Sequence, residues 1–236
     1  MALPKVNTPT YELAVPSTDD KIKFRPFLVK EEKILLIAME AQEQSGILNA
    51  VKDIVKSCTF DKFDVNRAPI FDIEYIFLNI RAKSVGEVST VNLRCPDDNE
   101  TFVQTDIDLT KVDVQLTKGH TNKIELTDEM GMIMTYPTLD SFTDSTTVIN
   151  ASNMLDVIAS CVAQIYDKKG EDVYDAKDST KQEIVDFIES LNSKQFKEIQ
   201  NFFDTSPKLT HTVTIENPKT KVKSDITLTG LNDFFV

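Results

Sequence analysis

The residues of this chain that could serve as acids, bases or nucleophiles are few and scattered. The two histidines, His120 and His211, lie in different regions of the sequence. His211 is in phase with the apolar residues of a predicted strand, which favours a packed side chain over a catalytic base. His120 follows Lys118 and Gly119 in a predicted turn. The sequence contains no Gly-x-Ser-x-Gly elbow, no Gly-x-x-x-x-Gly-Lys phosphate loop and no His-Glu-x-x-His zinc motif.

Neighbouring carboxylates offer one further route to acid–base chemistry. They occur at Asp19-Asp20 and at Asp97-Asp98. A catalytic pair needs surroundings that separate the two pKa values, whereas adjacent acids in a turn are typical of solvated loops. We therefore expect a protein that is not an enzyme and has no small-molecule substrate, with a small carboxylate-dependent hydrolase as a distant alternative.

The cysteines do not predict a disulfide framework or a metal site. There are three, Cys58, Cys95 and Cys161, and the chain does not begin with the apolar stretch of a signal peptide. An odd number without a signal peptide indicates a reducing compartment, so we expect localisation in the cytosol. Cys58 and Cys161 fall on apolar faces of predicted helices. The fragment Cys95-Pro-Asp-Asp98 supplies one thiolate and no later ligand pair, so neither a structural zinc nor any cofactor is expected.

Charge and hydropathy exclude two further classes of partner. The chain has 38 Asp and Glu against 26 Lys and Arg, with a formal net charge of −12. Proteins that bind nucleic acid need clustered basic residues to neutralise phosphates, so no nucleic acid partner is expected. The most apolar run, Ile34–Met39, is far shorter than a membrane span, so no membrane partner is expected.

Periodicity predicts a mixed α+β class with three segments. Residues 1–86 comprise a proline-rich arm, a hairpin from strands at 11–15 and 21–25, and helices at 30–44, at 47–58 and from Pro69, with Gly46 breaking the first from the second. Residues 87–138 form a small loop-rich β region. Residues 139–236 contain a helical stripe from Ala151 to Ile165, a helix capped by Thr180, another capped by Ser193, a C-terminal hairpin and an aromatic tail.

Several segments resemble the T-even-type bacteriophage baseplate hub protein family. The resemblance covers most of the chain and is clearest over residues 3–95. Its segments are Leu3-Pro4, Pro9–Leu13, Pro16–Thr18, Phe24–Ala38, Asp72–Glu87 and Thr229–Phe235.

The resemblance implies a structural protein at the centre of a contractile-tail baseplate. Such a protein is made late in the infected cell, binds other baseplate hub or tail proteins, and is located in the host cytoplasm during assembly and in the virion tail if it is retained. Two alternatives stay open within the family. The chain is either a hub subunit of the finished particle or a transient assembly chaperone that is absent from it.

Two regions are candidates for binding a partner. The first contains Arg25 and Phe27, in the Arg-Pro-Phe-Leu stretch, where the alternative is a strand-to-helix junction that packs in the core. The second is the tail, with Leu231, Phe234 and Phe235. An aromatic chain end is expected either to pack on its own domain or to dock on a partner, because exposed aromatic residues invite aggregation.

Overall fold

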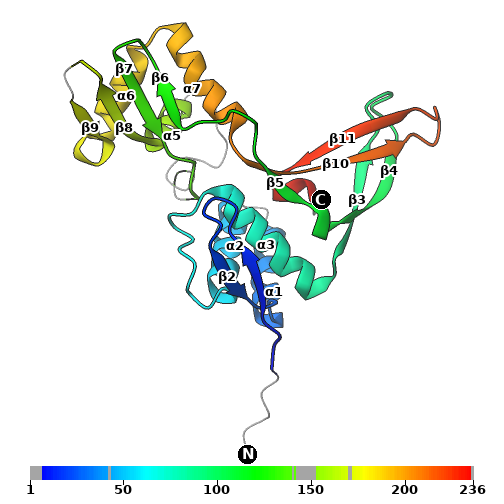
Figure 1. Ribbon diagram of the computed structural model, residues 1–236. Helices are drawn as coiled ribbons and strands as arrows, with labels where there is room; N and C mark the ends of the chain where they lie inside the picture. The colour runs from blue at the N-terminus through cyan, green and yellow to red at the C-terminus, as the bar shows by residue number, and fades with distance from the viewer. Residues whose placement is uncertain (1–6, 42–43, 140, 142–152, 170–171, 235–236) are drawn as a thin grey trace, which may run out of the picture. The chain divides into compact units, whose positions relative to one another are not determined.

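The structure is a computed structural model that describes residues 7–41, 44–139, 141, 153–169 and 172–234. The chain forms two compact units, which we call unit 1 (Met1–Gln115 with Lys208–Val236) and unit 2 (Leu116–Pro207). The described residues include six α-helices and eleven strands, all in small antiparallel sheets (Figure 1). The predicted α+β class is confirmed.

Unit 1 begins with a hairpin followed by three helices. The hairpin expected from the alternating sequence is confirmed, with Tyr11 paired to Phe24. Helix α2 packs against both α1 and α3. The elements are β1 (Tyr11–Ala14), β2 (Lys21–Phe24), α1 (Val29–Ala41), α2 (Gln44–Cys58) and α3 (Ile70–Val85).

The expected helix break at Gly46 is wrong. Helix α1 ends at Ala41 and α2 already begins at Gln44, so Gly46 lies in the first turn of α2. Glycine costs most in a helix interior. The first turn tolerates it more easily because its amides have no partner within the helix in any case.

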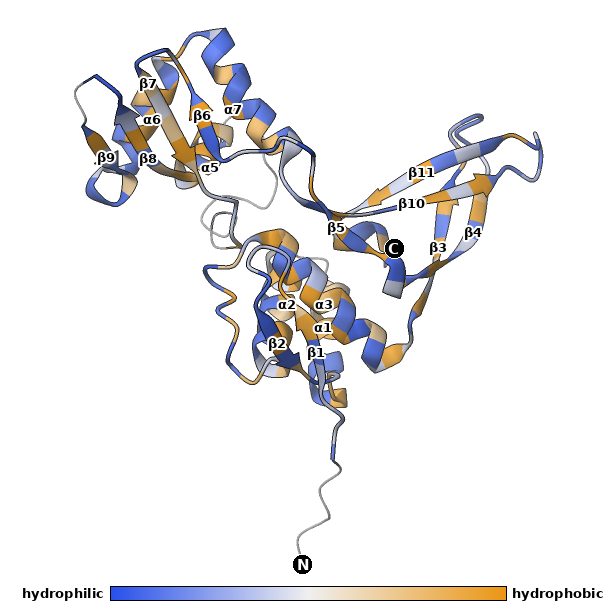
Figure 2. Cartoon of the chain, viewed as in Figure 1, coloured by the Kyte–Doolittle hydropathy of each residue, from blue (hydrophilic) through white to orange (hydrophobic). Residues whose placement is uncertain are grey.

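The rest of unit 1 is a β layer assembled from two distant parts of the chain. Strand β5 pairs with β10 in the order β11-β10-β5, while β3 and β4 form a separate hairpin. Strand β3 alternates polar and apolar residues from Thr90 to Arg94, and every second side chain from Ser89 to Leu93 is buried. The hydropathy of these strands is shown in Figure 2. These strands are β3 (Val88–Arg94), β4 (Phe102–Asp108), β5 (Asp113–Gln115), β10 (Lys208–Glu216) and β11 (Lys223–Thr229).

One core joins this β layer to α3. Leu78 and Ala82 of α3 pack in the same buried cluster as residues from β3, β4, β10 and β11. The cluster also includes Phe234, from the short 3-10 helix η3 (Leu231–Phe234). Helix α3 therefore connects the helical part of unit 1 with its β layer.

In its described residues, unit 2 consists of a four-stranded antiparallel sheet and three α-helices. The sheet order is β6-β7-β8-β9, and its core combines Met132, Ile158, Ile188 and Ile199. The elements are β6 (Lys123–Glu125), β7 (Met130–Met134), α5 (Met154–Ser160), β8 (Val162–Asp167), β9 (Val173–Asp175), α6 (Lys181–Glu189) and α7 (Ser193–Thr205).

The expected helical stripe from Ala151 to Ile165 is wrong in its second half. Ala151 lies outside the described residues, and α5 ends at Ser160. Val162 and Ile165 belong to β8, where Ile165 pairs with Met132. Cys161 consequently caps the helix rather than lying on its face. A run of apolar residues suits a helix or a buried strand equally, and here pairing with β7 decides for the strand.

Of the two helix caps expected from the sequence, Thr180 is confirmed and Ser193 is wrong. Thr180 forms the expected capping box with Glu183. The next helix is capped by Asn192, not by Ser193, and Gln195 completes a second capping box. Asparagine is at least as good an N-cap as serine, so the boundary moves by one residue.

The division into residues 1–86, 87–138 and 139–236 remains a prediction about domains. The two compact units are defined differently, by contacts in space rather than by consecutive stretches of sequence.

Among the helices that the structure describes, none has the length and apolar character needed to cross a membrane.

Candidate functional site

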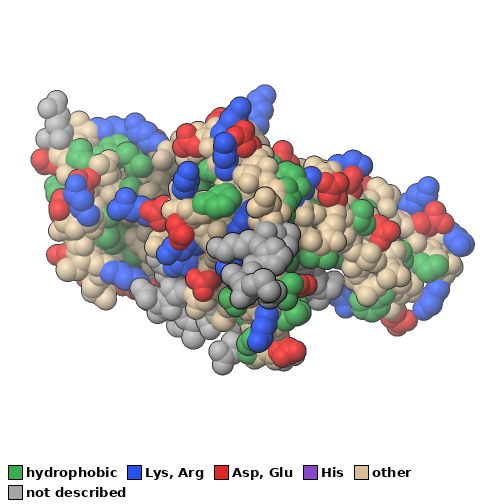
Figure 3. All heavy atoms as spheres, turned by 90° about the horizontal axis from the view of Figure 1, so that it is seen from below, with side chains coloured by type: hydrophobic (Ala, Val, Ile, Leu, Met, Phe, Trp, Pro, Cys, Tyr) green, Lys and Arg blue, Asp and Glu red, His purple; other side chains and the backbone are tan. Residues whose placement is uncertain are grey.

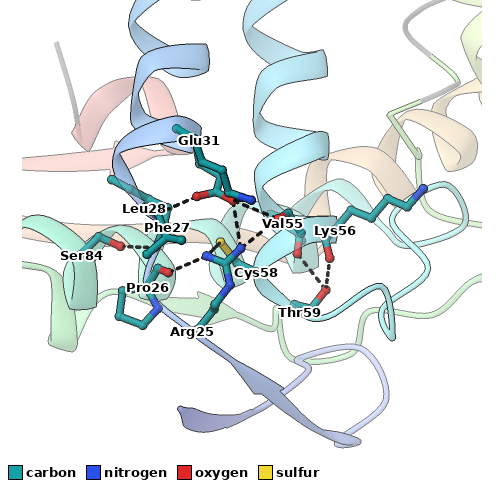
Figure 4. A network of polar contacts seen from close by, with 12 residues as sticks. Arg25, Pro26, Phe27, Leu28, Glu31, Val55, Lys56, Cys58, Thr59 and Ser84 are labelled. Carbon is teal, nitrogen blue, oxygen red and sulfur yellow. Dashed lines mark hydrogen bonds and ion pairs between the residues drawn. The ribbon is translucent and has the colours of Figure 1, made fainter. Parts of the chain in front are cut away.

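A buried ion pair fixes the junction between β2 and α1 (Figure 4). The Nη2 atom of Arg25 donates to Glu31 Oε1 at 2.9 Å and to Ser57 Oγ at 3.0 Å. Its Nη1 donates to the Pro26 carbonyl at 2.9 Å, and Glu31 Oε2 accepts from the Leu28 amide at 2.7 Å. The side chains of Arg25 and Glu31 are only 12% and 4% exposed. The network therefore ties the hairpin, α1 and α2 together at one point.

The electrostatics keep Glu31 ionised inside this network. Burial alone would raise the pKa of Glu31, but hydrogen bonds from Arg25, the Leu28 amide, Lys30 and Ser57 outweigh it and lower the pKa to about 2. Burial raises the pKa of the nearby Cys58 thiol to about 11. Cys58 is therefore a protonated packing residue and not a nucleophile.

Two polar side chains of helix α3, Asp72 and Ser84, accept hydrogen bonds from the backbone of the segments that flank strand β2. The amide of Phe27 donates to Ser84 Oγ at 2.9 Å. Asp72, which is 1% exposed, accepts from both the amide and the hydroxyl of Ser17 in the hairpin turn. Burial raises the pKa of Asp72 in spite of these bonds. The segments that carry the family resemblance, around Ser17, Phe27 and Asp72, thus contact one another in the fold.

The C-terminal segment packs on unit 1 as well. Phe234 is fully buried and its carbonyl accepts a hydrogen bond from Ser89 Oγ at 2.6 Å. Leu231 is partly buried against the same core, and its amide donates to Glu74 Oε1 at 3.2 Å. Of the two alternatives for the tail, this packing matches the first for Leu231 and Phe234. Phe235 lies outside the described residues.

Glu74 supports a prediction about pH. Burial raises its pKa to about 7, although the Leu231 amide lowers it somewhat. An acid whose pKa is raised on folding loses stability as pH rises from its unfolded value near 4.5 through 7. Glu74→Gln keeps an oxygen acceptor and removes this cost. We expect the variant to be about 2–3 kcal/mol more stable than the wild type at pH 8 and nearly equal at pH 4.5.

Scanning calorimetry of both proteins across this pH range measures the difference. Equal thermal unfolding midpoints for variant and wild type at pH 8 would show that Glu74 ionises in the folded protein without a cost in stability.

Helix α1 exposes an apolar surface that sequence reasoning missed. We call it the α1 surface, and its six side chains are between 40% and 79% exposed. Only Glu31 and Ala38 of this helix are buried. The α1 surface consists of Leu28, Val29, Ile34, Leu36, Ile37 and Met39.

This exposure is unusual for the second half of the helix, where the run Ile34–Met39 is apolar on all sides. A helix segment of this kind is normally buried, and large exposed apolar patches mark interaction sites. Hydrophobic side chains lie at the surface among charged ones in the view of Figure 3. The sequence signal for this surface was the apolar run Ile34–Met39. Such a run indicates an interaction surface once the structure shows that the described residues of unit 1 bury only one side of the helix.

The tips of two hairpins in unit 1 are joined by a polar cluster. Asn217, which is 1% exposed, donates from Nδ2 to Asp97 and Asp98 at 3.0–3.1 Å. Thr220 Oγ1 also donates to Asp97. Hydrogen bonds lower the pKa values of both acids, chiefly from Asn217 to Asp97 and from Thr101 to Asp98. Two carboxylates that are both ionised cannot divide the roles of general acid and general base.

Asn217→Ala is expected to destabilise the β layer by about 1–3 kcal/mol, because both carboxylates lose a buried donor. Thr227→Ala is the matched control, since it removes only the exposed hydrogen bond to Thr212 and is expected to change stability by less than about 0.5 kcal/mol. Hydrogen exchange of β10 and β11 reports both changes. Equal protection in the two variants would mean that the cluster adds no stability.

His120 lies in an aromatic cluster of unit 2. Its ring is 2.9 Å from Thr205 Oγ1 and 3.0 Å from the Tyr136 hydroxyl, and it packs against Phe202. Burial lowers its pKa, so the ring is neutral near pH 7. This is the geometry of a packing residue. Within the described ranges, no three His, Cys, Asp or Glu side chains are placed to hold a metal ion.

A surface depression of about 360 Å³ lies beside α2. Three lysines and three aspartates line it, together with Phe63, Val65 and Asn66. These are charges of both signs without a nucleophile next to a base, so the depression does not resemble an acyl- or phosphoryl-transfer site.

No curated protein sequence and no solved structure matches the chain. A family model described as "T4 bacteriophage base plate protein" matches residues 8–236, which include almost all the segments on which the resemblance rests. The chain therefore belongs to the T4 bacteriophage base plate protein family.

Proposed function

We propose that this protein is a structural subunit of the baseplate hub that acts through non-enzymatic contacts with other hub or tail proteins. The observation that carries the proposal is the α1 surface, since an apolar helix side that no described element of unit 1 covers is typical of a protein interface. Assembly takes place in the host cytoplasm, and the subunit is then retained in the virion tail.

The rigid scaffold under α1 supports this role. Arg25 is largely buried, so it serves the interface by fixing the direction in which α1 leaves the hairpin. Phe27 is half-buried beside the exposed Leu28 and Val29, at the edge of the α1 surface. A pre-organised surface loses less entropy on binding than a mobile one. We therefore assign Arg25 to positioning and Phe27 to the edge of the contact.

The tail contributes to the same proposal in a secondary way. Phe234 is buried in unit 1, so its part is to hold the β layer together, whereas Leu231 is only partly buried and retains surface for contact. The net charge of −12 favours partners with basic surfaces and disfavours nucleic acid.

A tagged chain expressed during phage infection tests the proposal. We expect other baseplate proteins to co-purify with the wild type and to be lost with Leu36→Glu, which places a charge in the α1 surface. The control is Leu116→Glu, because Leu116 is 70% exposed in unit 2, outside the α1 surface. Equal recovery of baseplate proteins with both variants would contradict a binding role for α1.

Mass spectrometry of purified particles separates a subunit from a transient assembly chaperone. Peptides of the chain at stoichiometric levels support the subunit, and absence of these peptides from infectious particles supports the chaperone. A substrate panel with Asp97→Asn and Asp98→Asn tests the distant hydrolase alternative, for which we expect no activity.

A further inference from the structure

Unit 2 is inserted into unit 1 between two paired strands. Strand β5 ends at Gln115 and β10 begins at Lys208, and these two residues lie opposite each other in the antiparallel ladder (Figure 1). Unit 2 therefore starts and ends at neighbouring positions of unit 1. We call residues 116–122 the entry segment and residues 205–207 the exit segment of unit 2.

One side chain ties these two segments together inside unit 2. Nδ1 of His120, in the entry segment, is 2.9 Å from Oγ1 of Thr205, the last residue of α7. Its Nε2 is 3.0 Å from the hydroxyl of Tyr136, which follows β7. Residues 116–119, between His120 and strand β5, are all exposed. The tie therefore anchors a segment whose other residues contribute little packing.

The neighbouring hydrogen bonds decide which nitrogen of the His120 ring carries the proton. The Thr205 hydroxyl donates to the Asn201 carbonyl at 2.7 Å, so its oxygen acts as an acceptor towards His120. Nδ1 is then the protonated nitrogen, and Nε2 accepts a hydrogen bond from the Tyr136 hydroxyl. In this tautomer the neutral ring satisfies both partners at once.

A second proton on the ring disturbs this arrangement. It makes Nε2 a donor, so the Tyr136 hydroxyl has to turn its own proton away. The stacked rings of Tyr136 and Phe202 attract a cation and do not themselves oppose protonation. Burial does oppose it, and it lowers the pKa of His120 below its ordinary range.

No charge is buried against the ring from the elements that contact it. The segment after β7 contributes the titratable Tyr136. In the entry segment and in α7, the charged residues nearest to the contact along the chain are Lys118 and Asp204, and both are exposed. The hydrogen bonds and burial of the ring therefore control when it takes up a proton.

The direction of the pH dependence follows from the lowered pKa. A histidine of this kind stabilises the folded state fully above its unfolded pKa of about 6.5. Its contribution is lost as the pH falls through the lower folded value, because the unfolded chain takes up the proton more readily. Acidification therefore weakens the tie between the entry and exit segments.

We propose that His120 is a pH-dependent clasp, which holds the entry and exit segments of unit 2 together while the ring is neutral with its proton on Nδ1, and releases them when the ring is protonated. The released state loosens the connection through which unit 2 is joined to the rest of the chain. The proposal concerns unit 2 and does not depend on the α1 surface or on what binds there.

NMR spectroscopy of the ¹⁵N-labelled full chain tests the tautomer. The chain has two histidines, so the spectrum of His211→Gln assigns the ring signals of His120. At about pH 8, we expect the proton of the neutral ring on Nδ1 and none on Nε2. A proton on Nε2 overturns the assignment of donor and acceptor, and with it the clasp.

Hydrogen exchange of the full chain tests the release. Protection factors are compared, because they are corrected for the effect of pH on exchange from an unstructured amide. We expect the protection of the entry and exit segments to fall at least about threefold between about pH 8 and about pH 5. Protection that does not change over this range overturns the proposal.

Matched variants distinguish a clasp from a residue that only packs. Thr205→Val keeps the branched shape but removes the acceptor for Nδ1, so low protection is expected at both pH values. Thr205→Ser keeps the hydroxyl and is expected to behave like the wild type. Tyr136→Phe keeps the stacked ring and removes the donor to Nε2, so a smaller pH dependence is expected.

His211→Gln is the control for the second histidine, and we expect it to leave the protection of both segments and its pH dependence unchanged. Circular dichroism verifies that each variant is folded. An undiminished pH dependence in both Thr205→Val and Tyr136→Phe overturns the proposal, and so does its loss in His211→Gln.

Discussion

Arg25→Met is expected to destabilise the junction of β2, α1 and α2 by about 3 kcal/mol, since it removes the buried ion-pair partner of the Glu31 carboxylate and leaves only the exposed Lys30, whose Nζ lies 3.2 Å from Glu31 Oε1. Glu31 is 3% exposed and cannot recover the lost interaction from water. Native-state hydrogen exchange of peptides from these elements measures the effect. This readout is preferred to a global midpoint because two compact units need not unfold as one.

Two further variants separate the ion pair from simple packing. Arg25→Met combined with Glu31→Leu removes both charges, and we expect it to recover most of the lost stability, as apolar replacements of buried ion pairs often do. Arg25→Lys keeps the charge but loses the planar guanidinium, whose Nη1 reaches the Pro26 carbonyl while Nη2 reaches Glu31 and Ser57, so an intermediate loss is expected.

The same pair predicts a pH dependence. Because the pKa of Glu31 is lowered to about 2 on folding, its contribution is complete above the unfolded value near 4.5 and disappears as pH falls towards 2. The deficit of Arg25→Met should therefore be full at pH 7 and shrink below about pH 4.5. A deficit that stays constant down to pH 2.5 would show that packing of the long side chain, not charge, accounts for the loss.

The local elements of the fold were predictable because their signals are local. Alternation over 11–25 predicts the first hairpin, and the Thr180–Glu183 spacing predicts a capping box; both are observed. Where one apolar run suited two periods, as in Val162–Ile165, the sequence could not decide. Only pairing with β7, far away in the sequence, selects the strand.

The candidate surfaces depend on contacts that no local pattern encodes. The pairing of β5 with β10, and the bonds from Asn217 to Asp97 and Asp98, join residues about a hundred positions apart. The exposure of α1 has the same origin. Its apolar run Ile34–Met39 is typical of a buried helix, and the sequence does not reveal that the described residues of unit 1 cover only one side of it. Sequence reasoning therefore named Arg25 and Phe27 and missed the helix that they position.

Phe234→Ala is expected to cost unit 1 about 3–5 kcal/mol, since it empties a fully buried aromatic position. The ring belongs to the core that combines α3 with β3, β4, β10 and β11, so hydrogen exchange should accelerate throughout these elements. Phe102→Ala is the matched control, because the Phe102 side chain in β4 is 61% exposed and its loss is expected to change stability by less than about 0.5 kcal/mol.

Truncation after Thr229 extends the test to the whole tail. It removes Phe234 together with Leu231, and it also removes the bonds that Ser89 and Glu74 make to this segment. We expect the truncated chain to lose at least as much stability as Phe234→Ala, or not to fold. A docking tail would behave differently, with protection in α3 and β3 unchanged while other baseplate proteins no longer co-purify. The two outcomes cannot be confused, because buried Phe234 acts on the stability of its own unit before any partner is present.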